Sequence, residues 1–147
     1  SDLREYQVPV EYGRSEIIRK GKKIAVLGVG SMIPSCMEIC KGLKDDGYDP
    51  TFVNARFVKP LDVDLLDELA KDHSLFVTVE ENVKSGGYGE HVSAYMEACH
   101  PEIRVLSAAV WDRFVPQGNV ESLRSRIGLG VEDIRQAIED SEELREQ

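Results

Sequence analysis

The chain has 147 residues, the size of one ordinary globular domain and enough to bury a hydrophobic core. Its 18 basic and 27 acidic residues give a formal net charge of −9, which argues against nucleic-acid binding because phosphate contacts need clustered Lys and Arg. No apolar run reaches the roughly 20 residues of a membrane span, and the polar first residues do not resemble a signal peptide. The sequence therefore predicts a cytoplasmic protein that does not associate with membranes.

The chain divides by composition into three parts. Residues 1–22 are predicted to be a linker or connecting segment, because Pro9, Gly13 and Gly21 interrupt two short candidate edge strands at residues 8–10 and 16–19. The domain proper is predicted over residues 23–141. Residues 142–147 are predicted to be an acidic tail. The surplus of acids from residue 132 onward is typical of a solvated helix face.

From residue 23 onward, short apolar runs alternate with segments of helical spacing. Strands are predicted at residues 24–29, 51–56, 75–80 and 103–108. Helices are predicted at residues 32–46, from an N-cap at Asp62, from the glycine turn at 86–89 to about residue 99, and at about 120–127 and 131–140. This alternation predicts an α/β fold with three layers, α/β/α, around a mostly parallel sheet of roughly five strands. It does not settle the strand order.

The cysteines and histidines give no metal site. Cys36 and Cys40 lie four residues apart on a predicted helix among apolar neighbours, which predicts two small buried thiols. Three cysteines do not suggest a disulfide framework. The three histidines are scattered without ligand spacing, at His73, His91 and His100.

Two glycine-containing turns deserve a functional interpretation. Gly28-Val29-Gly30-Ser31 follows a predicted strand, but Ile33 stands where a dinucleotide-binding turn needs its third glycine. A tight strand-to-helix turn is therefore predicted there. The segment Ser85-Gly86-Gly87-Tyr88-Gly89 opens a predicted helix, whose free N–H groups could hold an anion. Close packing against a neighbouring domain is the favoured alternative, because little basic charge lies nearby.

Glu80 and Glu81 end a predicted strand, where α/β folds present functional groups. Adjacent residues of a strand point to opposite faces, so the two carboxylates cannot readily act on one bond. Capping, a turn or an interface contact is the favoured interpretation. No nucleophile, base and orienting group can be assembled from the residue spacing, and no catalytic residue is predicted.

Several blocks resemble the last domain of 1-deoxy-D-xylulose-5-phosphate synthases, which are thiamine-diphosphate enzymes of the transketolase superfamily. They are Val-Asn-Ala-Arg-Phe-Val-Lys-Pro-Leu-Asp at 53–62, Val-Thr-Val-Glu-Glu-Asn at 77–82 with Gly-Gly-Tyr-Gly at 86–89, Asp-Arg-Phe-Val-Pro-Gln-Gly at 112–118 and Ile-Gly-Leu at 127–129. The blocks keep the family's order, and the match covers roughly residues 8–140. Trp111 departs from the family, which usually has proline before the Asp-Arg-Phe.

The resemblance implies a fold like that of the transketolase C-terminal domain, and a place in an enzyme that condenses pyruvate with glyceraldehyde 3-phosphate. Such enzymes release carbon dioxide and make 1-deoxy-D-xylulose 5-phosphate for isoprenoid and thiamine synthesis. Thiamine diphosphate and Mg²⁺ are held by the N-terminal and pyrimidine-binding domains, which this chain lacks. The resemblance thus implies no catalytic, cofactor-binding or metal residue here, and no activity of the chain alone.

What the resemblance does imply is a structural role in a homodimeric enzyme. The candidates for interface or anion contacts are Arg56, Lys59, Glu80, Glu81, Asn82, Ser85, Gly86, Gly87 and Gly89. We also expect an apolar patch where the second domain would pack. Two alternatives stay open: the same domain in a transketolase or a 2-oxo-acid dehydrogenase β subunit, and a stand-alone regulatory module that binds an anion. The sequence leaves open whether Ser1 is a natural start, and the oligomeric state.

Overall fold

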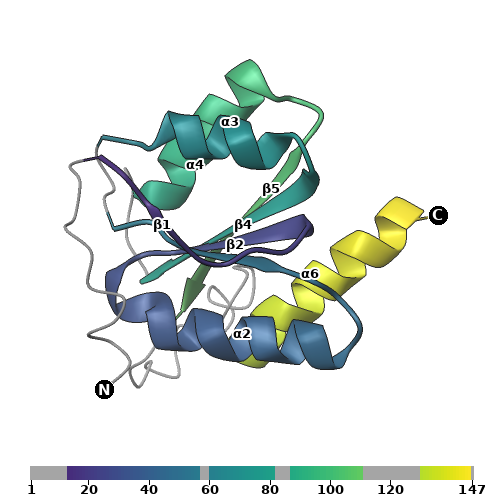
Figure 1. Cartoon of the computed structure of the whole chain (residues 1–147). Helices are drawn as coiled ribbons and strands as arrows, with labels where there is room; N and C mark the ends of the chain where they lie inside the picture. Colours follow the sequence, from purple (N-terminus) through teal and green to yellow (C-terminus); the bar gives the residue numbers. More distant parts are fainter. Residues whose placement is uncertain (1–12, 57–59, 82–86, 111–129, 147) are drawn as a thin grey trace, which may run out of the picture.

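The computed structural model describes residues 13–56, 60–81, 87–110 and 130–146, and the fold is that of these residues (Figure 1). Five strands form one sheet in the order β1-β3-β2-β4-β5. β1 pairs antiparallel with β3, and all other pairs are parallel. The predicted mostly parallel sheet of an α/β fold is confirmed. The strands are β1 (Glu16–Arg19), β2 (Lys23–Gly28), β3 (Thr51–Asn54), β4 (His73–Glu81) and β5 (Arg104–Val110).

Helices cover both faces of the sheet, as predicted. α3 and α4 lie on one face, and α2 and α6 lie on the other (Figure 1). A single 3-10 turn, η1, leads from β2 into α2. The bounds are η1 (Gly30–Met32), α2 (Ile33–Asp45), α3 (Val63–Ala70), α4 (Tyr88–Cys99) and α6 (Val131–Glu146).

At both ends of the chain, regular secondary structure extends into segments that were predicted to lie outside the domain. β1 lies inside the segment predicted as a linker, yet it belongs to the sheet. α6 begins at the predicted residue 131 but continues to Glu146, into the segment predicted as an acidic tail. The helix predicted at about 120–127 lies outside the described residues. The three-part division itself remains a prediction.

β2 is apolar without interruption from residue 24 to residue 27 because both of its faces are covered. In β2, Ile24 and Val26 belong to the core under α2 and α6, whereas Ala25 and Leu27 belong to the core under α3 and α4. All four side chains are buried. The apolar run at residues 24–27 therefore contributes side chains to two hydrophobic cores, one on each side of the sheet.

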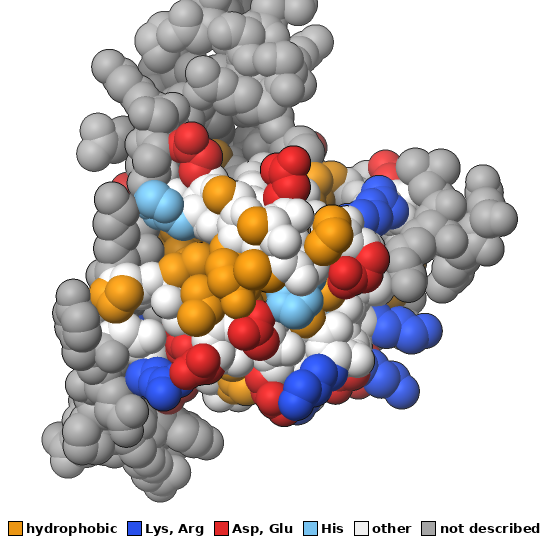
Figure 2. Space-filling view, turned by 90° about the horizontal axis from the view of Figure 1, so that it is seen from above, with side chains coloured by type: hydrophobic (Ala, Val, Ile, Leu, Met, Phe, Trp, Pro, Cys, Tyr) orange, Lys and Arg blue, Asp and Glu red, His pale blue; other side chains and the backbone are white. Residues whose placement is uncertain are grey.

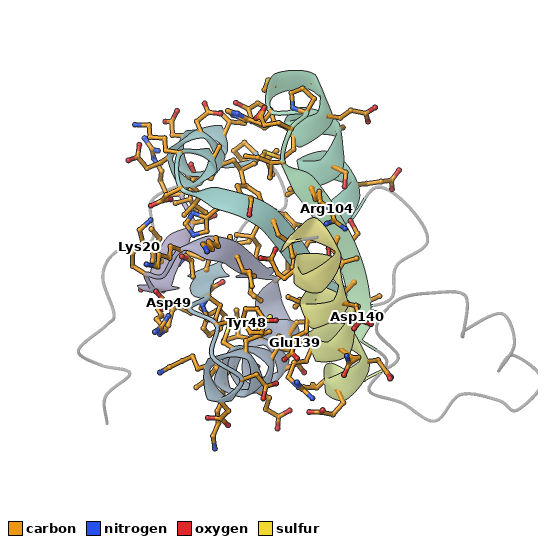
Figure 3. All side chains as sticks on the ribbon, turned by 90° about the vertical axis from the view of Figure 1, so that its right-hand side faces the viewer. Lys20, Tyr48, Asp49, Arg104, Glu139 and Asp140 are labelled. Carbon is orange, nitrogen blue, oxygen red and sulfur yellow. The ribbon has the colours of Figure 1, made fainter. Side chains whose placement is uncertain are left out.

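α6 packs on α2 through a close approach at Gly42. A Cβ atom at Gly42 would lie 2.4 Å from Cδ of Arg135, so glycine leaves room for the arginine. The Arg135 guanidinium pairs with Asp46 just after α2, and with Glu132 and Glu139 of α6, both at 2.6 Å. Glu139 points toward α2, while Asp140 faces away from it (Figure 3). On the other side of α6, Arg104 of β5 donates a 3.0 Å hydrogen bond to the Ser141 carbonyl.

Candidate functional site

The candidate site lies at the carboxyl edge of the sheet, which is the side where the parallel strands β2, β3, β4 and β5 end. β3 lies on one side of β2 and β4 on the other, so the chain connections diverge at the carboxyl ends of β2 and β4. Open α/β sheets place ligands and contacts at such a point. Backbone bonds tie the strand ends together: Val29 N–H donates to the Val79 carbonyl at 3.1 Å, and Ala55 N–H donates to the Gly28 carbonyl at 2.8 Å.

Glu80 caps helix α4 from the end of β4. Its Oε1 accepts from the Tyr88 N–H at 2.9 Å, and its Oε2 accepts from the Gly89 N–H at 2.7 Å. A carboxylate at this position satisfies two free amides and interacts favourably with the positive end of the helix dipole. Glycine is needed at 89, because a Cβ there would lie 2.7 Å from Glu80 Oε2 and 2.8 Å from Thr78 Oγ1.

This capping bears on the anion-site alternative. The amides of Tyr88 and Gly89 are already bonded to a carboxylate, whose charge would repel an incoming anion. The described part of the glycine turn therefore does not favour anion binding.

Glu81 makes a different contact. Its Oε1 accepts a 2.7 Å hydrogen bond from Ser31 Oγ in η1, and both side chains are exposed. This bond joins the end of β4 to the turn after β2. The two neighbouring carboxylates therefore serve separate partners, and the geometry does not combine them for acid–base chemistry.

Arg56 is held in an unusual backbone conformation. Its φ is +60°, a left-handed value that costs a non-glycine residue about 1 kcal/mol. Its N–H donates to Asn54 Oδ1 at 3.0 Å, and its guanidinium pairs with Glu16 of β1 at 2.9 Å. The Arg56 side chain is only 15% exposed. It thus attaches the edge strand to the end of β3.

The connection into α3 is built from polar contacts as well. Asp62 Oδ1 accepts from the Leu65 N–H at 3.2 Å, which confirms the predicted N-cap. Its Oδ2 accepts from the Ser15 N–H at 2.7 Å, and Ser15 Oγ donates to the Ala55 carbonyl. These bonds fix the chain entering β1 against the carboxyl edge.

The structure brings together part of the predicted contact set. Arg56, Glu80, Glu81, Gly87 and Gly89 lie at or beside the carboxyl edge. Lys59, Asn82, Ser85 and Gly86 lie outside the described residues. Ser31 was not predicted as a contact residue, since its partner Glu81 is 50 residues away in the sequence. Its place directly after a buried strand was the only signal.

A second polar cluster, which was not predicted from the sequence, lies at the amino edge of the sheet, where the parallel strands begin. The buried His73 ring faces Thr51 Oγ1 at 2.7 Å through Nε2, and its Nδ1 lies 2.6 Å from Asp72 Oδ1 and 2.8 Å from the Leu69 carbonyl. Because a carbonyl can only accept, Nδ1 carries the proton, and in the neutral ring Nε2 accepts from the Thr51 hydroxyl. Thr51 Oγ1 also accepts from the Gly21 N–H at 2.8 Å. Every member of this cluster is bonded within the fold.

The thiols are inert where they are buried. Burial raises the pKa of both Cys36 and Cys40 to about 12, so neither is a thiolate near neutral pH. Cys99 is exposed. Within the described residues, no three His, Cys, Asp or Glu side chains gather where they could hold a metal ion.

The outer face of α3 and α4 carries hydrophobic side chains. Figure 2 shows them gathered at the centre of this face, with acidic and basic groups around them. Val63 and Leu65 of α3 and Tyr95 of α4 are only partly buried. The phenol of Tyr95 donates to Asp67 Oδ1 at 2.7 Å, and His100 Nε2 lies 2.7 Å from the same oxygen. The hydrogen bonds from His100 and then Tyr95 lower the pKa of Asp67.

Comparison with known proteins defines the class of the chain. It belongs to the family described as "Transketolase, C-terminal domain", which matches residues 13–134. The match begins just before β1 and ends inside α6, so it takes in the whole sheet. No helix among the described residues is both long and apolar enough to cross a membrane.

The curated relatives are more particular. The chain is 38% identical over 133 residues to 1-deoxy-D-xylulose-5-phosphate synthase of Lachnoclostridium phytofermentans, covering 90% of this chain and 21% of the relative. It is 39% identical over 136 residues to the synthase of Dictyoglomus thermophilum, covering 92% and 22%. The chain thus spans about a fifth of the length of these relatives, and the predicted resemblance to this family is confirmed.

Solved structures agree on the fold. A "Split gene transketolase, inactive beta4 tetramer" matches with a TM-score of 0.74 and 28% identity, covering 91% of this chain and 43% of that one. A 2-oxoglutarate:ferredoxin oxidoreductase from Magnetococcus marinus matches with a TM-score of 0.50 at 15% identity, a likeness of fold alone.

Proposed function

We propose that this chain is the third domain of a thiamine-diphosphate-dependent 1-deoxy-D-xylulose-5-phosphate synthase. The complete enzyme would condense pyruvate with glyceraldehyde 3-phosphate and release carbon dioxide. The observation that carries the proposal is the identity of 34–40% to such synthases over about nine-tenths of this chain. A cytoplasmic location is part of the same proposal, supported by the likeness to these metabolic enzymes.

The domain's role in that enzyme is proposed to be structural. Thiamine diphosphate and Mg²⁺ would supply the carbanion chemistry from the other two domains. The described residues of this chain do not fit that cofactor: no metal-binding cluster forms, and Glu80 already fills the amino end of α4. No chemical step is therefore assigned to this chain.

The carboxyl edge is the proposed contact with the N-terminal and pyrimidine-binding domains, and with the homodimer partner. Support comes from the exposed Ser31–Glu81 pair and from the strained backbone of Arg56, which fix the surface there. The same proposal includes four candidates that lie outside the described residues but near Arg56 or Glu81 in the sequence: Lys59, Asn82, Ser85 and Gly86.

The test compares the complete open reading frame that encodes this chain with the chain alone. With thiamine diphosphate and Mg²⁺, we expect the complete protein to form 1-deoxy-D-xylulose 5-phosphate, and the chain alone to leave pyruvate unchanged. Pyruvate decarboxylation by the chain alone would contradict the structural role. A complete protein that transfers two-carbon units between sugar phosphates, without consuming pyruvate, would be a transketolase instead.

A further inference from the structure

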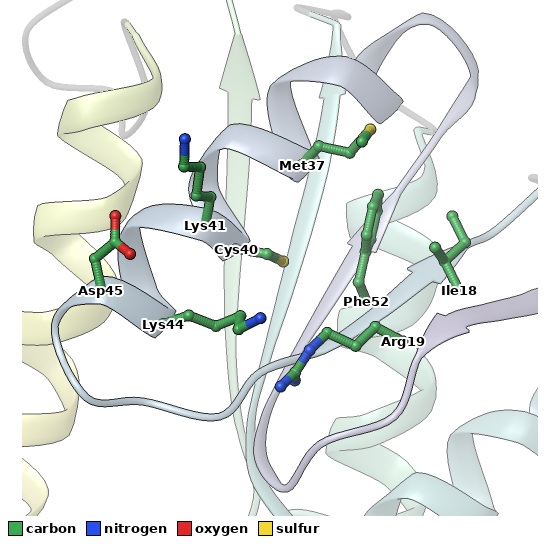
Figure 4. A pocket seen from close by; sticks show the side chains of 8 residues that line it. All are labelled: Ile18, Arg19, Met37, Cys40, Lys41, Lys44, Asp45 and Phe52. Atoms are coloured by element: carbon green, nitrogen blue, oxygen red, sulfur yellow. The ribbon is translucent and has the colours of Figure 1, made fainter.

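A groove of about 440 Å³ lies between the edge strand β1 and helix α2, away from the carboxyl-edge contacts (Figure 4). Its floor is apolar and its rim is charged. Ile18, Met37, Cys40 and Phe52 form the apolar part. Arg19, Lys41, Lys44 and Asp45 stand around it.

A β-bulge gives the groove its wall. Ile17 pairs with Val53 and Arg19 pairs with Phe52, so the register shifts across Ile18. Two consecutive residues of β1, Ile18 and Arg19, therefore both line the groove, where a regular strand would turn one of them to the opposite face.

Two of the four apolar lining residues are open to solvent, whereas Cys40 and Phe52 are buried. Met37 is 59% exposed and Ile18 is 47% exposed. Among the large hydrophobic residues that the structure describes, only Ile17 joins them as exposed, and it is the neighbour of Ile18 on β1. Such a concentration beside a single groove is typical of a surface that another molecule covers.

The rim offers unpaired positive charge. Lys41 and Lys44 are exposed, and neither forms an ion pair with any residue in the described ranges. Arg19 differs, because it already pairs with Asp49 at 2.8 Å and donates to the Pro50 carbonyl at 2.6 Å. Lys44 extends from α2 toward Arg19 (Figure 4). Arg19 is neutralised by Asp49 and the acid Asp45 also stands on the rim, so the unpaired cations of the groove are the two lysines, in a chain whose net charge is −9.

We propose that the groove docks an acidic polypeptide segment that carries a bulky apolar side chain, supplied by a partner protein. The apolar side chain covers Met37 and Ile18, and carboxylates lie beside Lys41 and Lys44. This inference does not depend on the enzymatic activity proposed above.

A polypeptide fits better than a small ligand. The lining residues Ile18, Met37 and Lys44 remain exposed, so the groove would cover a small molecule on one side only, whereas ligand pockets enclose most of their ligand. β1 also ends the sheet among the described strands, and the backbone of an edge strand can pair with an extended segment.

The experiment selects peptides from a randomised twelve-residue phage library on the wild-type chain, with subtraction on a Lys41→Glu/Lys44→Glu variant. We expect recovered peptides to combine Asp or Glu with Phe, Trp, Leu or Ile. A recovered peptide titrated into the ¹⁵N-labelled chain should shift the amides of Ile18, Met37 and Lys44. The Lys44→Glu variant should weaken its binding about tenfold. Met37→Ser should weaken it by a similar factor.

Lys71→Glu is the control, because it makes the same charge change at the C-cap of α3, on the opposite face of the sheet, where Lys71 pairs with Glu68. It should alter binding less than about twofold. Circular dichroism verifies that each surface variant is folded. The proposal is overturned if no peptide is enriched or if the enriched peptides are neutral or basic. It is also overturned if Lys44→Glu and Lys71→Glu change the peptide affinity by the same factor.

Other occupants would also overturn it, each with its own result. Groove amides that shift with protein concentration alone would identify a second copy of this chain as the occupant. Octanoate that saturates the groove more tightly than the recovered peptide would identify a small apolar anion.

Discussion

The two edges of the sheet use polar residues in opposite ways. At the amino edge, the His73 ring, the Thr51 hydroxyl and the Leu69 carbonyl are bonded to one another out of contact with solvent. At the carboxyl edge, Glu81 and Ser31 are exposed, and Arg56 holds a strained backbone. The amino edge is built for stability, because an unsatisfied buried polar group is costly. The carboxyl edge presents groups that a neighbouring domain can contact.

The largest effect is expected at the amino edge. His73→Ala removes a buried ring together with the acceptor of the Thr51 hydroxyl, and it leaves the Leu69 carbonyl with a backbone donor, the Asp72 N–H. We expect the free energy of unfolding to fall by about 3 kcal/mol, measured by urea denaturation. His91→Ala, at a partly exposed ring on α4, serves as the control. A loss below about 1 kcal/mol for His73→Ala would mean that the amino edge is not a stabilising network.

An intermediate effect is expected for Glu80, which caps α4 from the end of β4. Glu80→Gln places an amide group against the N–H donors of Tyr88 and Gly89 and removes the charge at the helix terminus. The expected loss is about 1–2 kcal/mol in the same measurement. An unchanged denaturation midpoint would show that α4 does not need this cap.

A smaller, pH-dependent effect is expected for the link between α3 and α4 at Asp67. The hydrogen bonds from His100 and Tyr95 lower the pKa of Asp67 below its ordinary value of 3.8. A lowered pKa in the folded state stabilises the fold above pH 3.8 and loses this contribution as the pH falls through the folded value. The stability difference between wild type and Asp67→Asn should therefore be present at pH 6 and shrink toward pH 3. A constant difference between these pH values would rule out the titration of Asp67 as its cause.

The smallest effect on stability is expected for the exposed pair at the carboxyl edge. Ser31→Ala should change the free energy of unfolding by less than about 0.5 kcal/mol, since solvent replaces the lost bond to Glu81. In the complete enzyme, the same substitution should weaken association of the domains if this edge is an interface, measured by limited proteolysis between them. A large loss of stability in the isolated chain would erase the contrast between the two edges.

The positions of the elements were largely predictable from local chemistry. Apolar runs predicted β2 and β4, because both faces of these strands are buried. Asp62 predicted the start of α3, because its carboxylate caps that helix. The buried thiols of α2 followed from their spacing. The true end of α6 did not, because its last turns are rich in acids that sequence patterns assign to a tail.

What the sequence determined by itself is the class of fold and the family, since periodicity and short blocks of residues are local properties. The tertiary structure decided the partners. Glu80 and Glu81 are adjacent and chemically alike, yet one caps α4 and the other bonds Ser31, because neighbouring residues of a strand point in different directions. The groove beside β1 could not be predicted from the sequence either. Its wall depends on a bulge, and its charge depends on which lysines find no partner once the helices have packed.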